Sequence, residues 1–211
     1  MKTFIITKFD IDENGRYIGD LNTSEKINGH LTIEAELGYV RFKASLWVAG
    51  YIFAKAGSGI MAGEGIKAGW GIEAGWGIEA GWGIEAGEGI KAGWGIEAGS
   101  GIKAGWGIEA GWGIMAGEGI EAGLAIIAKT ISSRLRIFAG IAIWRQPIIE
   151  EMQIRAKLVD GTVAFGELVE PKEVQPKEVA SAIIKGVSEA QNGGVNVIQP
   201  DSFTIEGETV Q

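Results

Sequence analysis

The sequence holds few side chains that could do acid–base, nucleophilic or metal chemistry. It contains one histidine, His30, and no cysteine, so thiolate sites and sites built from three histidines are excluded. A lone histidine beside Asn28 and Gly29 is more often a surface or turn residue than a catalytic one. We therefore expect that the chain is not an enzyme and that it binds no metal and no cofactor.

Two other patterns could indicate chemistry. The unit Gly-Trp-Gly-Ile-Glu-Ala matches the loose Gly-x-Gly-x-x-Gly/Ala pattern of dinucleotide sites, but that pattern needs a preceding strand and a following helix. Here it recurs every six residues. Carboxylates that act as acid–base pairs need burial or convergent geometry. The glutamates of the repeated unit alternate with lysines on a surface that we expect to be convex. This arrangement favours ladders of solvated ion pairs.

A six-residue repeat must position these residues. From Gly57 to Gly123 the unit is Gly-x-Gly-Ile-(Glu/Lys/Met)-Ala. A period of six places the isoleucines on no single face of an α-helix, and two glycines per unit would destabilise one. The alternation of Ile, a charged residue and Ala predicts a short strand with Ile and Ala turned inward. Gly-x-Gly then forms a corner, because glycine adopts backbone angles that other residues avoid, and x points outward.

The charges predict how many repeats make one coil, because like charges on neighbouring strands are unfavourable. Three hexads per coil stack opposite charges, whereas two hexads would stack five glutamates in one column. With three hexads per coil, only Glu79 and Glu97 form a like-charged pair. The two alternating columns read Lys55–Glu73–Lys91–Glu109 and Lys67–Glu85–Lys103–Glu121. Hexads in one phase from Phe42 to Ile126 give a triangular, single-chain β-helix of about five coils.

The repeat over residues 40–130 resembles the left-handed hexapeptide-repeat β-helix family. Members of that family are triangular prisms with three hexads per turn, and the Ile-Glu pair fits their pattern of an aliphatic residue followed by a small or acidic one. The family prefers a small residue at the fifth hexad position, where this chain places Trp76 or Trp82. The resemblance therefore concerns architecture. The family's acyltransferases use a catalytic histidine and its carbonic anhydrases use three, whereas this chain has only His30.

The segments that flank the repeat predict an all-β cap and a mixed tail. Residues 3–11 are rich in β-branched and aromatic types, Asn14-Gly15 is a hairpin turn signal, and residues 16–18 begin a return strand. We also expect a hairpin over 152–169 around Asp160-Gly161. A linker with two Pro-Lys-Glu-Val copies and a short helix over 180–190 would follow. The predicted regions are an N-terminal β cap (1–41), the β-helix (42–145) and a C-terminal hairpin, linker and tail (146–211).

Composition limits the partners. The formal net charge of -8 makes direct binding of nucleic acid unfavourable, because phosphates need Lys and Arg. No segment has the length of a membrane span and the N-terminus has no secretory pattern, so we expect a cytoplasmic protein. Between Gly57 and Gly123 nine Glu and three Lys give a net charge of -6.

These features favour an interaction protein that presents a rigid, acidic, Trp-rich rod to a protein partner. The acidic solenoid resembles pentapeptide-repeat DNA mimics and small inhibitors from phages and mobile elements, including anti-CRISPR proteins. This resemblance implies an inhibitor of a basic, nucleic-acid-binding host or defence protein. The candidate partner-binding surface comprises Trp70, Trp76, Trp82, Trp94, Trp106, Trp112, Glu64, Glu79, Glu88, Glu97 and Glu118.

Two alternatives stay open at this level. The tryptophans could bind a sugar polymer, a flat surface or a protein, or Trp76, Trp94 and Trp112 could simply stack in one column. The chain could also be a structural solenoid that assembles end to end as a homo-oligomer, similar to bactofilin filaments. Hairpins at both termini would oppose such assembly by covering the edges of the rod.

Overall fold

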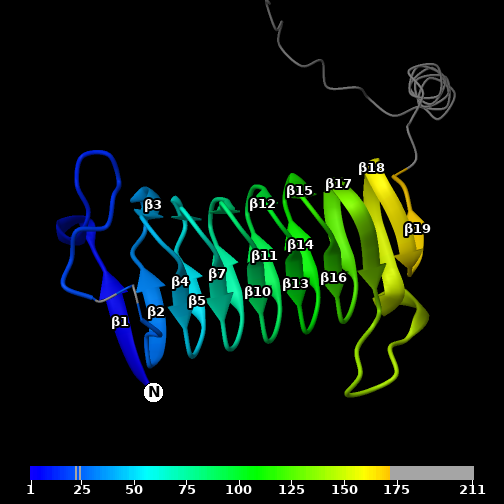
Figure 1. Cartoon of the computed structure of the whole chain (residues 1–211), viewed down its shortest axis with the longest axis horizontal. Coiled ribbons are helices and arrows are strands. Elements are labelled where there is room, and N and C mark those ends of the chain that lie inside the picture. Colours follow the sequence, from blue (N-terminus) through cyan, green and yellow to red (C-terminus); the bar gives the residue numbers. More distant parts are fainter. Residues whose placement is uncertain (22, 24, 172–211) are drawn as a thin grey trace, which may run out of the picture. The chain divides into compact units, whose positions relative to one another are not determined.

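Residues 1–21, 23 and 25–171 are described by the structure, which is a computed structural model. They form a parallel β-solenoid of about eight turns (Figure 1). Among the described residues no helix has the length and apolar character of a membrane span. The strands and 3₁₀-helices are β1 (Lys2–Ile6), η1 (Lys8–Asp10), β2 (Gly29–Ile33), β3 (Gly38–Phe42), β4 (Leu46–Val48), β5 (Ile52–Ala54), β6 (Ser58–Ala62), β7 (Ile66–Ala68), β8 (Ile72–Ala74), β9 (Ile78–Ala80), β10 (Ile84–Ala86), β11 (Ile90–Ala92), β12 (Ile96–Ala98), β13 (Ile102–Ala104), β14 (Ile108–Ala110), β15 (Gly113–Ala116), β16 (Ile120–Ala122), β17 (Ile126–Ala139), η2 (Ile149–Met152), β18 (Gln153–Phe165) and β19 (Glu167–Val169).

Strands pair in parallel with the strand three positions further along the chain. Ile84 of β10 lies between Ile66 of β7 and Ile102 of β13, so each coil of the regular region contains 18 residues. This confirms three hexads per coil. The repeat strands form three columns, which are β2–β5–β8–β11–β14, β3–β6–β9–β12–β15 and β4–β7–β10–β13–β16.

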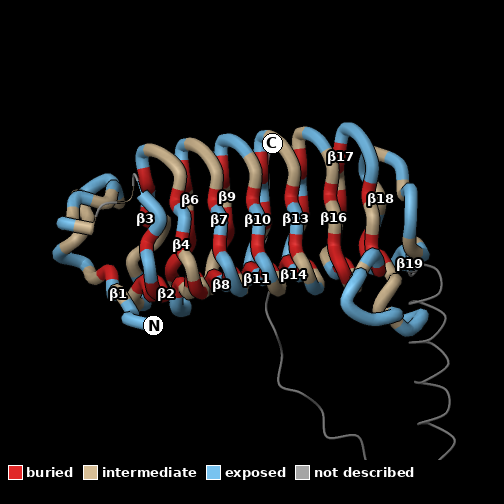
Figure 2. The backbone as a smooth tube through the Cα atoms, turned by 60° about the horizontal axis from the view of Figure 1, so that its bottom comes forward, coloured by how far each residue is buried: buried red, intermediate tan, exposed pale blue. Residues whose placement is uncertain are grey.

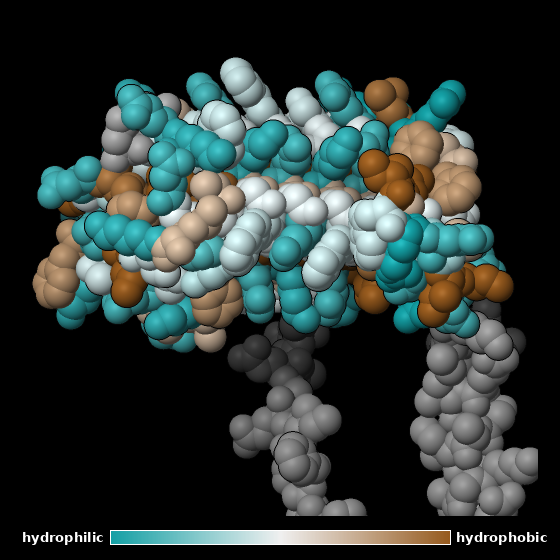
Figure 3. Space-filling view, turned by 90° about the horizontal axis from the view of Figure 1, so that it is seen from below, coloured by the Kyte–Doolittle hydropathy of each residue, from teal (hydrophilic) through white to brown (hydrophobic). Residues whose placement is uncertain are grey.

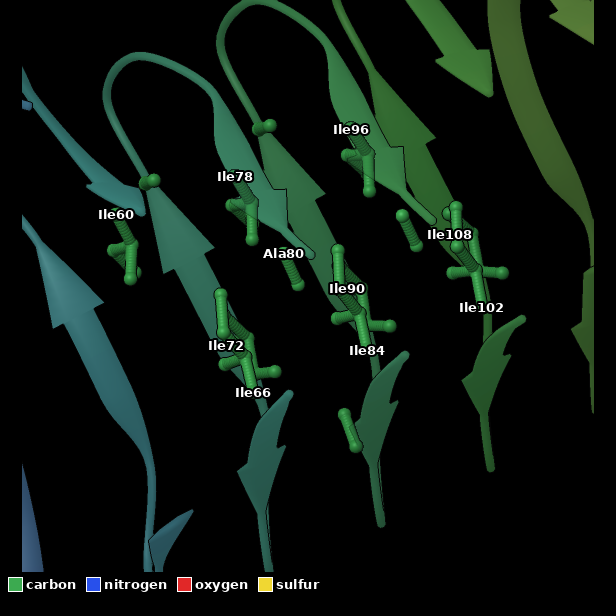
Figure 4. Packing of buried hydrophobic residues seen from close by; sticks show 14 of the residues in the cluster. Ile60, Ile66, Ile72, Ile78, Ala80, Ile84, Ile90, Ile96, Ile102 and Ile108 are labelled. Atoms are coloured by element: carbon green, nitrogen blue, oxygen red, sulfur yellow. The ribbon is translucent and has the colours of Figure 1, made fainter. Parts of the chain in front are cut away.

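The core consists of isoleucine and alanine from every hexad. In each regular strand both residues are buried, whereas the residue between them is exposed or half-buried, as the alternating colours of Figure 2 show. The side chains of Ile66, Ile84 and Ile102 occupy the same position on successive turns (Figure 4). A single coil could not bury these side chains, so the stacking of coils supplies the hydrophobic stabilisation.

The first coils follow a different phase from the one predicted. Val40, Leu46 and Ile52 align with the isoleucines of the next coil, which shifts the register there to 20 residues. Two extra residues between β5 and β6 account for the shift. Phe42 therefore occupies an alanine position, and Phe53, rather than the predicted Lys55, lies beside Glu73.

The corner glycines are required by close approach and not by unusual backbone angles. Of the glycines in the regular repeat only Gly57 has a positive φ. A Cβ on Gly87, the first glycine of its hexad, would lie 2.1 Å from the backbone O of Gly69 one turn earlier. A Cβ on Gly89, the second glycine, would lie 3.3 Å from the O of Gly107. The backbones of successive corners are thus packed directly on each other, which corrects the predicted reason for glycine.

The N-terminal segment extends the solenoid. β1 pairs in parallel with β2, with Phe4 beside Leu31. The predicted strand over 3–11 is therefore confirmed only as far as Ile6, and its pairing in a hairpin is wrong. The predicted turn at Asn14-Gly15 is confirmed, but it connects a single bridge and not two paired strands. Gly15 has a φ of 73°, and a single antiparallel bridge joins Ile11 to Tyr17.

The C-terminal part of the described chain also extends the stack. The 14-residue β17 follows the course of a whole turn and pairs in succession with β14, β15 and β16. β18 pairs in parallel with β17 and β19. The predicted hairpin around Asp160-Gly161 is therefore wrong. A Cβ on Gly161 would lie 2.5 Å from the O of Ser133, as at a corner between stacked turns.

These added strands raise the number of turns from the predicted five to about eight. The triangular cross-section remains a prediction. The predicted linker beyond Pro171 and the predicted helix over 180–190 lie outside the described residues.

Candidate interaction surfaces

The corner residues of successive coils form three ridges along the solenoid. Within each ridge the backbone N–H of one corner residue donates to the carbonyl O one turn earlier, as from Trp94 to Trp76 at 3.2 Å and from Ser100 to Trp82 at 3.0 Å. The six tryptophans are consequently divided among three edges. Ridge A contains Ser58, Trp76, Trp94 and Trp112; ridge B contains Trp70, Glu88, Trp106 and Leu124; ridge C contains Glu64, Trp82, Ser100 and Glu118.

Ridge A combines ring stacking with a cation. The Trp76 and Trp94 rings stack with centroids 5.5 Å apart and an angle of 17° between planes. Trp112 continues the ridge, and Lys129 Nζ lies 4.1 Å from its ring centroid. Tyr39 packs edge-on against Trp76, which is half-buried, whereas Trp94 and Trp112 are 59% and 65% exposed. Stacking and exposure therefore occur on the same ridge.

Two faces of the solenoid carry alternating charges. Five of the six predicted opposite-charge neighbours stand in register, and the sixth, Lys55 with Glu73, is wrong. Because these groups are about half exposed, each ion pair adds little to stability. The ion pairs are Lys67–Glu85 at 2.8 Å, Lys91–Glu109 at 3.2 Å and Lys103–Glu121 at 3.3 Å.

The third face concentrates unbalanced negative charge. Glu97 of β12 lies beside Glu79 of β9 on one side and Met115 of β15 on the other. Burial and then a hydrogen bond with Glu79 raise the pKa of Tyr39 to about 12. The predicted like-charged pair is thus present in register.

Replacing Glu97 with lysine should raise the free energy of unfolding by about 0.5 kcal/mol, because a like-charged cross-strand pair becomes an opposite one. The matched change Lys91→Glu should lower it by a similar amount, because the new carboxylate would stand between Glu73 and Glu109. Urea denaturation at low and high salt measures both. If both changes raised the free energy of unfolding, or both lowered it, the charge register would be contradicted.

The raised pKa of Tyr39 predicts a loss of stability in alkali. Its phenol has an ordinary pKa of 10.0 and holds its proton more tightly in the folded chain. Its contribution to stability is therefore complete below pH 10 and is lost as the pH rises towards 12. Thermal melting between these pH values should show a smaller decline for Tyr39→Phe than for the parent chain. A decline of the same size in both chains would assign the effect to other groups.

A groove runs beside ridge B over the column β5–β8–β11–β14. It has a volume of about 790 Å³. Its lining combines aromatic residues with charged ones and includes Gly71, Gly89 and Gly107. The aromatic and charged lining residues are Tyr51, Phe53, Trp70, Trp106, Glu73, Glu88, Lys91, Glu109, Glu150 and Glu151.

Residues near each end of this groove make further aromatic contacts. At one end Tyr51 stacks on His30 with centroids 4.1 Å apart, and the His30 ring meets Trp70 edge-on at 4.9 Å. At the other end Trp144 lies 6.3 Å from Trp106. Arg145 covers Trp144 at 4.7 Å and forms an ion pair with Glu151 at 2.5 Å, which fixes the connection between β17 and β18.

His30 is a structural residue in a strand and not the predicted surface or turn residue. It lies in β2, is 8% exposed, and its Nδ1 accepts a hydrogen bond from the Tyr51 backbone N–H at 3.2 Å. Among the described residues no group of three or more His, Cys, Asp or Glu side chains is placed to hold a metal ion.

Comparisons with protein-family models, with curated proteins and with solved structures found no match.

Sequence reasoning missed Tyr39, Tyr51 and Trp144, which make aromatic contacts beside the ridges. Tyr39 and Tyr51 each precede the first core residue of a strand, where later coils have the second glycine. Placing Val40 and Ile52 in the isoleucine phase would have aligned both tyrosines with glycines. Trp144 had no such signal, because it lies in an irregular connection outside the repeat.

Proposed function

We propose that the chain is a non-enzymatic interaction protein that presents a rigid, acidic, Trp-rich β-solenoid to a protein partner. The observation that carries this proposal is the exposure of the corner tryptophans. Five of the six are between 45% and 65% exposed although every core position is filled. Large exposed aromatic side chains on a rigid surface are typical of binding sites, and Trp is enriched among residues that dominate binding energy.

The finer form of the proposal is inhibition of a basic, nucleic-acid-binding protein. Glu79 and Glu97 on one face, together with Glu64, Glu88 and Glu118 on the ridges, lie outside the Lys–Glu ladders. Carboxylates at the regular spacing of stacked turns could attract a surface that binds phosphates. The ladders neutralise part of the remaining charge, so the attraction would be local to these positions.

Affinity capture with the immobilised full chain tests this function. A discrete protein should be retained at low salt by the parent chain. Retention should fall for Trp94→Ala with Trp112→Ala and for Glu97→Lys, and it should weaken at high salt if the partner is basic. Retention that is unchanged in all these variants, or the absence of any specific protein, would contradict the proposal. The variants need parent-like circular dichroism spectra for the comparison to be valid.

A second candidate function is structural, by end-to-end assembly. β1 and β19 are the terminal strands of the described stack. In the part of the chain that the structure describes, only a single antiparallel bridge, from Ile11 to Tyr17, remains of the two predicted capping hairpins that would oppose such assembly. Exposed apolar side chains gather towards both ends, as part of one face in Figure 3 shows. They include Met1, Ile5, Phe9 and Ile18 at one end and Val159, Phe165 and Val169 at the other. Size-exclusion chromatography with light scattering separates a discrete species from concentration-dependent polymers.

A further inference from the structure

Ridge B differs from the other ridges in the spacing of its tryptophans. Trp70 and Trp106 are two turns apart with Glu88 between them, whereas Trp76 and Trp94 on ridge A occupy successive turns and stack on each other. Two turns correspond to about 9.6 Å at the strand spacing of a sheet. Ridge C has the single tryptophan Trp82. Among the three ridges only ridge B therefore has two indoles at this longer interval with no indole between them, and both line the groove beside it.

The interval matches one conformation of an extended peptide. A polyproline II helix has three residues per turn and advances about 9.3 Å in that turn, so residues i and i+3 face the same side. In a β-strand residues i and i+3 point to opposite faces, so they could not both meet the ridge. The groove spans the register positions of Phe53, Glu73, Lys91, Glu109 and Ile127, a length of about 19 Å. That length fits about six residues of polyproline II.

The charge of the groove selects a basic segment. Lys91 pairs with Glu109, and Glu151 pairs with Arg145. Glu73, Glu88 and Glu150 therefore give the lining an excess of negative charge, and no ion pair within the described residues involves Glu88. Aromatic-lined grooves hold proline-rich segments because the ligand is already ordered before it binds. An arginine or lysine beside the prolines could pair with Glu88.

We propose that the groove along ridge B binds a proline-rich, basic segment of a partner protein in polyproline II conformation. Prolines three residues apart lie against Trp70 and Trp106, and a basic residue of the segment pairs with Glu88. The proposal rests on the proposed function, because it names the kind of protein partner and the surface that recognises it.

Fluorescence anisotropy with the full chain tests this site. The probe is a fluorescein-labelled oligoproline with an arginine at each end, and it should bind saturably. Trp106→Ala should weaken binding about tenfold or more, the loss typical of an aromatic anchor, and Glu88→Lys should weaken it too. Trp82→Ala on ridge C is the matched control, because Trp82 occupies the same hexad position and is 61% exposed, and its binding should stay within twofold. Trp106→Phe should keep part of the affinity if Trp106→Ala proves poorly folded.

Three results would overturn the proposal. The first is no saturable binding of the probe, and the second is an equal loss in the Trp82→Ala control. The third is tighter binding of a basic helical peptide or of a β-glucan oligosaccharide that depends on Trp70 and Trp106. Capture of a protein through ridge A or through Glu97, together with any of these results, would leave the proposed function standing and remove only this site.

Discussion

Replacing Gly87 with alanine should lower the free energy of unfolding by about 3 kcal/mol or more. The added Cβ would lie 2.1 Å from the Gly69 carbonyl O, and the obstructing atom belongs to the backbone, which cannot rotate away. Relief requires the two turns to separate at this corner. Such a shift would weaken the hydrogen bond from the Gly87 N–H to the Ala68 carbonyl, which is now 3.1 Å long.

Gly89→Ala is the matched control for this prediction. It adds the same methyl group to the same corner, but the new atom would lie 3.3 Å from the Gly107 carbonyl O, where a shift of a few tenths of an ångström suffices. Urea denaturation followed by circular dichroism compares the two changes. An equal cost at both positions would show that glycine is needed for backbone flexibility and not for the close approach of successive turns.

Ile90→Ala should lower the free energy of unfolding by about 2–5 kcal/mol, the range for a large buried aliphatic residue replaced by alanine. Ile90 is 1% exposed and lies between Ile72 and Ile108 in its column. The core is filled by isoleucine and alanine alone at this level, and the coils above and below fix the backbone, so collapse into the cavity is restricted.

Lys91→Ala controls for the local effect on β11. Lys91 neighbours Ile90 in the same strand but faces solvent, and its ion pair with Glu109 is exposed, so the change should alter stability by less than about 1 kcal/mol. Comparison of denaturant midpoints and slopes for the two variants is the measurement. A loss of less than about 1 kcal/mol for Ile90→Ala would mean that the coils readjust freely around a missing side chain.

The close stacking of the glycine corners affects the surface of the solenoid as well as its stability. The same direct stacking of glycine corners that should make Gly87→Ala costly also sets the interval between corner side chains. An indole on every second turn of ridge B therefore repeats at a distance fixed by backbone hydrogen bonds and not by flexible loops. A rigid array of this kind can distinguish ligands by their own repeat length.

The repeat determined most of the regular region directly from the sequence. Ile, a charged residue and Ala alternate in every unit, so the inward and outward sides of each strand followed from the pattern. Stacked opposite charges then identified 18 residues per coil, because a coil of two hexads would have brought Glu73 and Glu85 into one like-charged column. The structure confirms this register from Ile66 to Ile120.

The candidate site was only partly predictable, because it depends on which corner each tryptophan occupies. The 18-residue coil correctly assigned Trp76, Trp94 and Trp112 to one column. The groove beside Trp70 and Trp106 could not be recognised, because its lining also includes Tyr51 from the coil with the shifted phase and Glu150 from the connection between β17 and β18.

Wherever the unit repeats, the sequence alone therefore determined the strands, the coil length and the inward-facing residues. The coil length followed because three hexads per coil stack mostly opposite charges, whereas two hexads stack like charges. Tertiary structure decided the rest. Two extra residues near Gly57 change the phase of the first coils, and counting back in steps of six from the regular repeat does not detect such a shift. β1 and β18 join the stack instead of forming hairpins, because pairing with the exposed edges of β2 and β17 satisfies their backbone groups and buries Ile6 and Ile154.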